Sequence, residues 1–412
     1  MNKKQMKKIL TDMAHTRVSC TAQEKEAAEY LAARCEELGV KARLESFGVE
    51  TGDVSFASLK ADGSDVPCTG YKLCGSGSVK APFLYLPHLD KASLAEAKGK
   101  IVMVDGYLGL FPYKDIVDAG ALGFITYDGN VRYADRDIDS RAVRADLAEG
   151  RKILGVNVNA KDAAKLVKAA PKEIEIRVEQ KEYTGESHNV VAELPGESDE
   201  WIVLTAHYDS TPLSPGVWDN MSGCVGILGM LEAAVKASRD KKLRYGVRLV
   251  FCGSEERGLL GSKAYVAAHE AELGKVALNI NLDMIGSAMG KFIAVVSAEK
   301  QLVDFIKYYS VLEGWSIEAR SGVYSSDSTP FADKGVPAVS FARIATANQA
   351  TIHGRYDTME VMSMPQLEKD IDFLSAFVLR FIGAPACPVG REMPDDVKKQ
   401  LDEYLGRKRK DQ

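Results

Sequence analysis

The 412-residue sequence contains no long uninterrupted apolar run. A membrane-spanning helix needs roughly 18 or more such residues, and the best candidate, residues 373–382, is short and contains Arg380. The basic N-terminus is followed at once by Asp12 and His15, so it lacks the apolar core of a secretory signal peptide. We therefore expect no membrane partner and a cytoplasmic location, with a trimmed secreted precursor as the open alternative.

An excess of positive charge is also missing. Lys and Arg number 53 against 58 Asp and Glu, a net charge of −5, whereas nucleic-acid binders usually carry a basic domain. The seven cysteines are odd in number and scattered, which is typical of reduced thiols. The hydrophobic share of 46% and the charged share of 27% are ordinary for a globular protein. These values exclude nucleic-acid binding and the disordered, collagen-like and disulfide-scaffold classes.

The composition and the predicted secondary structure change twice along the chain. Residues 1–50 start with a helix capped by Thr21 and Glu24 and continue into a strand. Residues 51–182 consist of short β-like runs with many Gly and Ser, and from residue 183 strands alternate with helices up to residue 388. This pattern predicts an α/β domain with a central sheet flanked by helices, formed by residues 1–50 and 183–388. Residues 51–182 are the predicted β-rich insert, and residues 389–412 the predicted charged, solvated tail.

Polar side chains with metal or proton-transfer chemistry stand at the ends of three predicted strands. His207 and Asp209 follow the strand 201–206, Glu255 and Glu256 follow the strand 247–252, and Asp283 ends an apolar strand. Open α/β sheets place their sites at such strand ends. Imidazole is a good zinc ligand, and a carboxylate two residues later can accept its other N–H. Two adjacent carboxylates repel, but a metal ligand beside a general base explains the pair.

Two further segments complete the set of candidate ligands. Asp219 precedes a predicted helix at residues 222–238, and His353 is followed by Asp357, a candidate hydrogen-bond partner for its ring. Each motif alone has a simpler explanation, such as a helix cap at Asp219 or a solvated glutamate pair. Together the histidines and carboxylates are what two metal ions, roughly 3.5–4 Å apart, require. The residues therefore favour a two-metal hydrolase.

Other chemistries find weaker support. Gly223, Gly226 and Gly229 do not have the order of a dinucleotide-binding loop. Ser210 and Ser254 do not stand in a nucleophile-elbow context.

The motifs resemble the co-catalytic di-zinc aminopeptidase family that also includes the glutamate carboxypeptidases. The matching segments are HYDS (207–210), WDN (218–220), SEERGLLGS (254–262), NLDMIG (281–286), SSDSTPFADKGVPAVSF (325–341) and IHGRYDT (352–358), and residues 187–197 extend the match upstream. The resemblance implies the zinc-peptidase fold for the α/β domain. Residues 99–106, 119–129 and 155–166 of the insert resemble a protease-associated domain.

The resemblance also implies a ligand set for two zinc ions per chain. Asp219 would bridge the two ions. His207 and Asp283 would complete one site, and Glu256 and His353 the other.

The same resemblance implies a role for two more residues, Glu255 and Asp209, and its one departure from the family pattern leads to a hypothesis about a third, Tyr324. Glu255 would be the general base, taking a proton from a water bridging the two zinc ions and passing it to the leaving amine. Asp209 would orient the ring of His207. Many family members carry a Tyr just before the last His, where this chain has Ile352, so Tyr324 is the expected donor to the developing oxyanion. The implied activity is removal of N-terminal residues from peptides.

A carboxypeptidase, dipeptidase or amidohydrolase using the same two ions is the alternative. Arg343, after the strand 336–341, would then bind a substrate carboxylate, or it pairs with an acidic neighbour instead. A non-catalytic module would have lost Glu255 or a ligand, and a single-zinc relative of the glutaminyl cyclase kind would not keep both ligand sets. Cobalt or manganese would suit the same donors. Oligomeric state, side-chain specificity and the role of the insert stay open.

Overall fold

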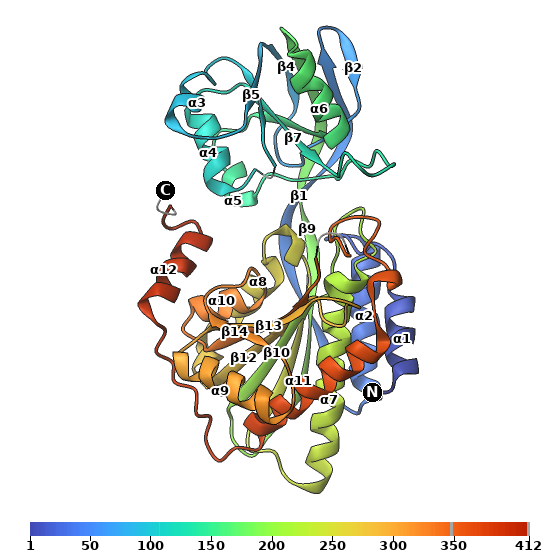
Figure 1. Cartoon of the computed structure of the whole chain (residues 1–412), viewed down its shortest axis with the longest axis vertical. Coiled ribbons are helices and arrows are strands. Elements are labelled where there is room, and N and C mark those ends of the chain that lie inside the picture. The colour runs from blue at the N-terminus through green and yellow to red at the C-terminus, as the bar shows by residue number, and fades with distance from the viewer. Residues whose placement is uncertain (107, 347–348, 410–412) are drawn as a thin grey trace. The chain divides into compact units, whose positions relative to one another are not determined.

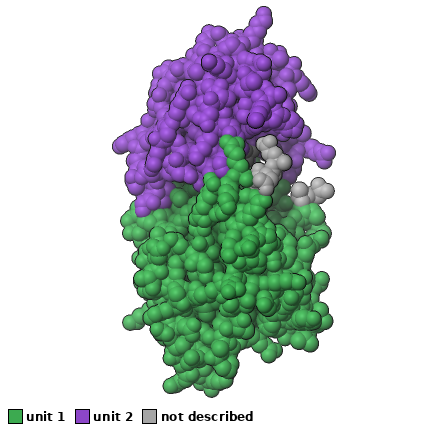
Figure 2. All heavy atoms as spheres, turned by 90° about the vertical axis from the view of Figure 1, so that its left-hand side faces the viewer, with its two compact units in different colours: residues 1–47, 186–412 green, residues 48–185 purple. Residues whose placement is uncertain are grey.

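The structure is a computed structural model and describes residues 1–106, 108–346 and 349–409 (Figure 1). The chain divides into two compact units, one of residues 1–47 and 186–412 and one of residues 48–185, called unit 1 and unit 2 (Figure 2). Strands β1 (Ala42–Ala61) and β9 (Ile174–Leu194) cross the two boundaries and contribute residues to both units. The residues predicted as an insert all lie within unit 2.

Unit 1 is built on a mixed sheet whose strands follow the order β14-β13-β15-β12-β10-β11-β9-β1. Strands β11, β10, β12 and β15 are neighbours and run parallel, whereas β9 and β13 pair antiparallel with β11 and β15. Beyond β1 and β9, their bounds are β10 (Trp201–His207), β11 (Gly246–Cys252), β12 (Val276–Leu282), β13 (Lys291–Ser297), β14 (Glu318–Ser321) and β15 (Ala338–Ile344). The predicted α/β class with a mixed, helix-flanked sheet is confirmed.

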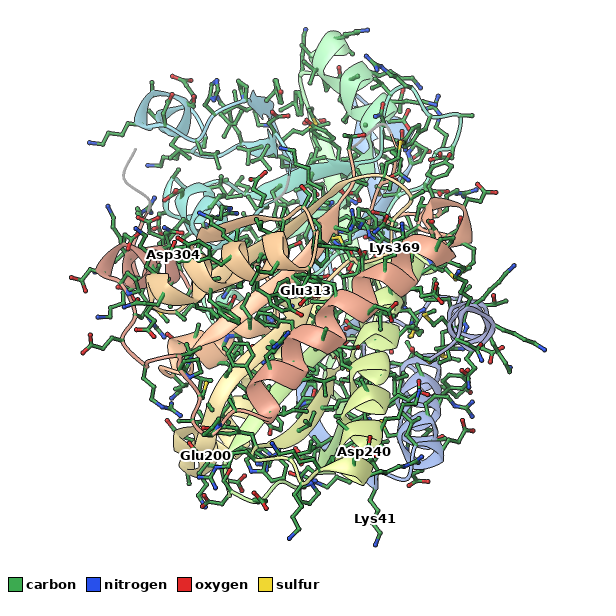
Figure 3. The ribbon with its side chains drawn as sticks, turned by 60° about the horizontal axis from the view of Figure 1, so that its bottom comes forward. Lys41, Glu200, Asp240, Asp304, Glu313 and Lys369 are labelled. Atoms are coloured by element: carbon green, nitrogen blue, oxygen red, sulfur yellow. The ribbon has the colours of Figure 1, made fainter. Side chains whose placement is uncertain are left out.

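Helices cover this sheet, and charged side chains such as Asp240, Asp304 and Lys369 point outward from them (Figure 3). The helices of unit 1 are α1 (Lys3–Asp12), α2 (Ala22–Glu37), α7 (Ser222–Asp240), α8 (Leu260–Ala268), α9 (Lys300–Leu312), α10 (Ser328–Asp333), α11 (Met364–Ile382) and α12 (Asp395–Tyr404).

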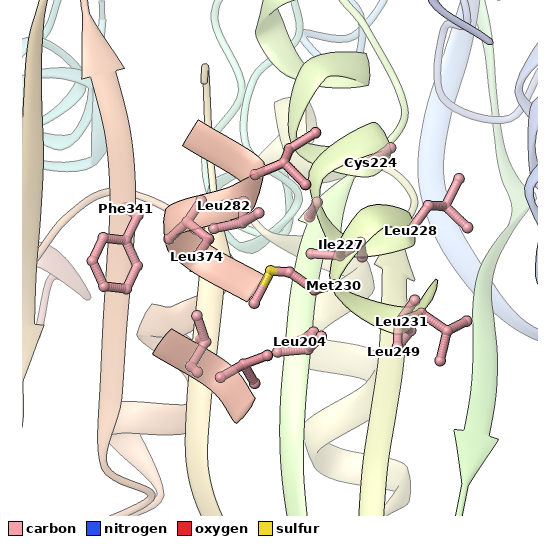
Figure 4. Close-up of a cluster of buried hydrophobic side chains, with 14 of the residues drawn as sticks. Leu204, Cys224, Ile227, Leu228, Met230, Leu231, Leu249, Leu282, Phe341 and Leu374 are labelled. Carbon is pink, nitrogen blue, oxygen red and sulfur yellow. The ribbon is translucent and has the colours of Figure 1, made fainter. Parts of the chain in front are cut away.

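The core of unit 1 lies between the parallel strands and helices α7 and α11. Leu204 and Leu249 of the sheet face Ile227 of α7 in a fully buried cluster (Figure 4). Strands buried on both faces read as near-continuous apolar runs, as β10 and β11 do. Gly229 lets α7 approach α11, because a Cβ atom there would lie 2.5 Å from Ile371 Cγ2. This packing fixes the strand ends that carry the candidate ligands.

One helical run, Val217–Asp240, has the length and apolar composition to cross a membrane, and 67% of its most apolar window is buried inside the protein. That burial is the mark of a core helix.

The C-terminal segment differs from the predicted solvated tail. Residues 395–404 form α12, which buries Val397 and Leu401. Arg407 donates to Asp333 at 2.6 and 2.7 Å. Apolar residues at helical spacing inside a strongly charged stretch explain why this helix docks. Lys410 lies outside the described residues.

Unit 2 has its own sheet, in the order β3-β8-β7-β6-β5, and its own apolar core. Strand β4 pairs with the first part of β9. The elements are β2 (Ser64–Val66), β3 (Cys68–Gly70), β4 (Gly77–Ala81), β5 (Phe83–Leu86), α3 (Lys91–Ala95), β6 (Ile101–Val104), α4 (Leu110–Asp118), β7 (Gly123–Asp128), α5 (Ala145–Ala148), β8 (Leu154–Asn159) and α6 (Ala160–Ala169). The unit thus contains helices as well as strands, and its resemblance to a protease-associated domain stays a prediction.

Candidate metal centre

Three neighbouring parallel strands bring the predicted strand-end residues to one edge of the sheet. His207 is the last residue of β10, and its register partner on β11 is Cys252, three residues before Glu255. Asp283 directly follows β12, the other neighbour of β10. Because the strands run parallel, their carboxyl ends meet, as in other open α/β sheets.

Asp219 lies between the two histidines. Its Oδ1 is 3.1 Å from His207 Nε2, and its Oδ2 is 3.3 Å from His353 Nε2. It sits in the kinked turn Val217–Met221 before α7, where its own backbone leaves the helical conformation. One carboxylate therefore presents one oxygen to each imidazole, which is the arrangement that a bridging ligand needs.

The remaining candidate ligands complete two overlapping groups. His207, Asp219 and Asp283 form one, and Asp219, Glu256 and His353 form the other, with the donor atoms of each group within 4.8 Å of one another. Asp283 Oδ1 lies 3.8 Å from His207 Nε2, and Glu256 Oε2 lies 3.1 Å from His353 Nε2. The structure brings together all five residues that the resemblance implied as ligands.

Glu255 lies beside these groups. It begins the 3-10 turn Glu255–Arg257 after β11, and its Oε2 is 3.9 Å from His207 Nε2. Ser254, directly before it, adopts a left-handed backbone conformation with φ of 54°. This turn places two consecutive glutamates at the cluster, with Glu255 near His207 and Glu256 near His353.

Burial and neighbouring charges strongly shift the pKa values of the histidines and glutamates in the cluster. Burial would lower the pKa of His353, but Glu256 and Asp219 raise it to about 12. The pKa of His207 is likewise raised well above its usual value, against the effect of burial, by Glu255 and other carboxylates. Burial raises the pKa of Glu256 to about 7 and that of Glu255 well above its usual range. In the protein alone, protons must therefore supply the positive charge that this cluster of carboxylates requires.

The cluster fits divalent cations. Asp283 Oδ1 and Glu256 Oε1 are buried and, within the part of the chain that the structure describes, accept no hydrogen bond. Buried charged oxygens are costly unless they are paired or coordinate a metal. Imidazole and carboxylate donors around a shared carboxylate are a donor set that zinc accepts.

Asp209 contacts more than the ring of His207. Its Oδ1 is 3.5 Å from His207 Nδ1, too long for a well-formed hydrogen bond. Both of its oxygens instead accept backbone hydrogen bonds, from Glu255 N at 2.9 Å and from Glu256 N at 3.2 Å. Asp209 therefore links the loop after β10 to the turn that carries the two glutamates.

Asp357 has a different partner from the one expected. It was a candidate partner for the ring of His353, but its carboxylate accepts hydrogen bonds from Trp218 N at 2.7 Å and Asp219 N at 3.0 Å. Asp357 is fully buried, and its carboxylate holds the backbone of Asp219. Sequence reasoning missed this because a backbone N–H carries no mark of residue type.

The structure also shows the surroundings of two further predicted residues, Tyr324 and Arg343. Burial, followed by the negative charges of Asp283, Asp219 and Glu255, raises the pKa of Tyr324 far above its usual value. Arg343, in contrast, donates from Nε and Nη2 to Asp370 at 2.9 and 2.6 Å.

Comparison with known proteins agrees with this geometry. Residues 189–378 match the model of peptidase family M28. Over this segment, just under half of its length, the chain is similar to peptidase family M28. The match covers all five candidate ligands, Glu255 and Tyr324, and the predicted enzyme class, a peptidase, is confirmed.

Relatives of known name extend the likeness beyond that segment. Aminopeptidase YwaD of Bacillus subtilis is 26% identical over 95% of this chain and 86% of its own length. Leucine aminopeptidase 2 of Trichophyton rubrum is 35% identical over 47% of this chain, which spans only 38% of that relative. The solved structure of a zinc aminopeptidase from Bacillus subtilis aligns with a TM-score of 0.76 at 22% identity, over 96% of this chain and 98% of that one. The predicted zinc-peptidase fold is thus shown over nearly the whole chain.

Proposed function

We propose that this protein is a zinc aminopeptidase that binds two zinc ions per chain and removes N-terminal residues from peptides. The observation that carries the proposal is Asp219, whose two oxygens face His207 and His353 in two overlapping ligand groups. The match of residues 189–378 to peptidase family M28 and the names of the relatives support the peptide substrate and the N-terminal direction.

The chain's residues divide into ligands and a base. His207, Asp219 and Asp283 hold one ion, and Asp219, Glu256 and His353 hold the other. Bound zinc supplies Lewis acidity and makes a bound water more acidic.

Glu255 is the proposed general base. It takes a proton from the attacking water and delivers it to the amine that leaves, so one carboxyl group acts twice. Its place on a backbone held by Asp209 keeps the carboxylate at the ligand cluster. Tyr324 donates its phenolic proton in a hydrogen bond to the oxyanion that forms on the substrate carbonyl.

The surroundings of Arg343 favour the aminopeptidase over the carboxypeptidase alternative. A carboxypeptidase needs a free cation for the substrate carboxylate, and Arg343 was the residue considered for that role. Its Nε and Nη2 donate to the two carboxylate oxygens of Asp370, and its Nη1 donates to Gly290 O at 3.1 Å.

The first experiment is mass spectrometry of a peptide pool incubated with the zinc-loaded protein. The pool contains free and N-acetylated N-termini, each with free and amidated C-termini. We expect stepwise loss from free N-termini only, stopped by a chelator. Loss from C-termini, or cleavage of dipeptides alone, would replace the aminopeptidase by the alternative.

The second experiment counts the metal. Zinc content by elemental analysis after dialysis should approach two ions per chain for the parent protein, and fewer for Asp219→Ala, which removes the shared ligand. A parent protein that saturates with one ion would contradict the bridging role.

A further inference from the structure

Arg17 is a buried arginine outside the segment that matches the family. It lies between α1 and α2, and its side chain is 0% exposed. A guanidinium is costly to bury unless its N–H groups find acceptors. The five acceptors of the Arg17 side chain are all backbone carbonyls, and three of them belong to the loops of the metal centre.

Arg17 donates hydrogen bonds to two loops that are distant from it in the sequence. Its Nε donates to Tyr208 O at 2.6 Å, Nη2 donates to Gly216 O at 2.9 Å, and Nη1 donates to Pro215 O at 2.7 Å. The backbone N–H of Arg17 also donates to Ser210 Oγ at 3.0 Å. Nη1 makes two more hydrogen bonds, to carbonyls of its own segment.

These acceptors flank the candidate ligands. Tyr208 stands between His207 and Asp209, and Gly216 lies three residues before Asp219. One rigid side chain therefore joins the loop that carries the first histidine to the loop that carries the bridging carboxylate.

The fit around the guanidinium is tight. Gly216 has a φ of 60°, and a Cβ atom there would lie 2.7 Å from Arg17 Nη2 and 2.8 Å from Ser210 Cβ. Glycine is the residue that permits both this backbone conformation and this approach.

The charge of Arg17 also lies close to the acidic cluster. Asp209, Asp357 and Asp219 all interact with it electrostatically. A fixed buried cation reduces the repulsion among carboxylates that must remain ionised to bind metal.

We propose that Arg17 is a positioning residue that sets the separation between His207 and Asp219 and so the geometry of the metal centre. The inference rests on the proposed two-metal function. Arginine suits the task because its planar guanidinium offers five donors in fixed directions, whereas lysine offers three donors on one rotating ammonium.

The test is Arg17→Lys, compared with the parent in both the zinc-loaded and the cobalt-loaded form. We expect kcat to fall about 10–100-fold, as for other residues that orient metal ligands, with KM within about twofold. The visible absorption of the cobalt form should change, because these bands report ligand geometry. The control is Arg248→Lys, since Arg248 is 4% exposed and pairs with Glu193 and Glu272.

A structural role alone would give a different result. If Arg17→Lys lowered only the thermal midpoint, as we expect of Arg248→Lys, and left kcat and the cobalt spectrum unchanged, the proposal would be wrong. If Arg17→Lys did not fold, Gly216→Ala would test the same anchor, because its Cβ atom would lie 2.7 Å from Arg17 Nη2; a loss of kcat is expected, and an unchanged kcat and spectrum would count against the proposal.

The two proposals fail in different ways. A parent protein that binds two cobalt ions but cleaves no peptide would overturn the aminopeptidase, while the spectra would still decide the role of Arg17. A parent protein that binds no cobalt and no zinc would overturn both.

Discussion

The carboxylate of Asp209 accepts a hydrogen bond from the backbone N–H of Glu255, with Oδ1 2.9 Å from the nitrogen. The same oxygen is 3.5 Å from Nδ1 of His207. A residue expected to orient a histidine ring thus also fixes the position of the proposed general base.

Asp209→Asn should therefore affect both neighbours. The amide keeps one acceptor oxygen and turns an NH2 group toward the N–H of Glu255 or Glu256, where an acceptor is needed. We expect kcat to fall about 10–100-fold and zinc to bind more weakly. Steady-state kinetics and zinc titration measure the two effects. Asp199→Asn, at an exposed carboxylate paired with Lys275, is the control, and equal results for both variants would contradict the role.

The adjacent glutamates should separate chemistry from metal binding. Glu255→Gln removes the base and should reduce kcat by about 10²–10⁴-fold while zinc content stays near that of the parent. Glu256→Gln removes a ligand charge and should lower the zinc content. Elemental analysis beside kinetics distinguishes the two, and the roles would be reversed if Glu255→Gln were the variant that lost metal.

Tyr324→Phe tests the expected oxyanion donor. Loss of one such donor typically reduces kcat by about 10²–10³-fold, and KM should change little. Tyr309→Phe, on helix α9, is the control for loss of a phenol elsewhere. An unchanged kcat in Tyr324→Phe would remove this residue from the mechanism.

Arg343→Ala should reduce stability without changing which peptide ends are recognised. The substitution leaves the carboxylate of Asp370, which is fully buried, without its cation. Breaking such a pair costs about 3–5 kcal/mol of unfolding free energy, measurable by urea denaturation. The ratio of kcat/KM for free and amidated C-termini should equal that of the parent, and a changed ratio would restore a substrate role.

Glu24 should make stability depend on pH. Burial and the charge of Asp209 raise its pKa to about 8 from a usual value of 4.5. Between those values the folded chain keeps a proton that the unfolded chain releases, so the free energy of unfolding falls as pH rises from about 5 to about 8. Glu24→Gln removes this titration and should flatten the dependence. Urea unfolding of the metal-free protein across this range measures it.

The control for Glu24→Gln is Glu26→Gln, an exposed glutamate on the same helix. It should keep the pH dependence of the parent. If both variants matched the parent, the carboxyl group of Glu24 would have no such role.

Local sequence predicted many elements of unit 1 but not the extent of the strands that lead out of it. The strand expected within residues 1–50 is the start of β1, and β1 and β9 run across the predicted boundaries at residues 50 and 183, as far as Ala61 and back to Ile174. Backbone hydrogen bonds between two paired strands do not depend on composition, so the strands continue past the point where the composition changes. Helix α8 begins at Leu260, because Gly258 and Leu259 both adopt left-handed conformations just before it.

The capping pair at the start of α2 shows the same limit. Thr21 accepts from Glu24 N as predicted, but the carboxylate of Glu24 does not complete a capping box. It accepts instead from Ser187 Oγ at 2.7 Å and from Ser254 N at 3.0 Å, next to the proposed base. Its Oε2 accepts from Cys20 N at 2.6 Å, one residue before the cap, so the buried carboxyl group has a local partner as well as tertiary ones.

The sequence by itself was sufficient to propose which residues carry the chemistry. Few side chains bind zinc or move protons, and the segments that resemble a known family contain the candidates His207, Asp219, Glu255, Asp283 and the others. The tertiary structure alone decided which oxygen of Asp219 faces which histidine, and that Asp209, Asp357 and Arg17 hold backbone groups. The physical reason is that every residue but proline offers the same backbone N–H and C=O, so these partners are chosen by packing and not by residue type.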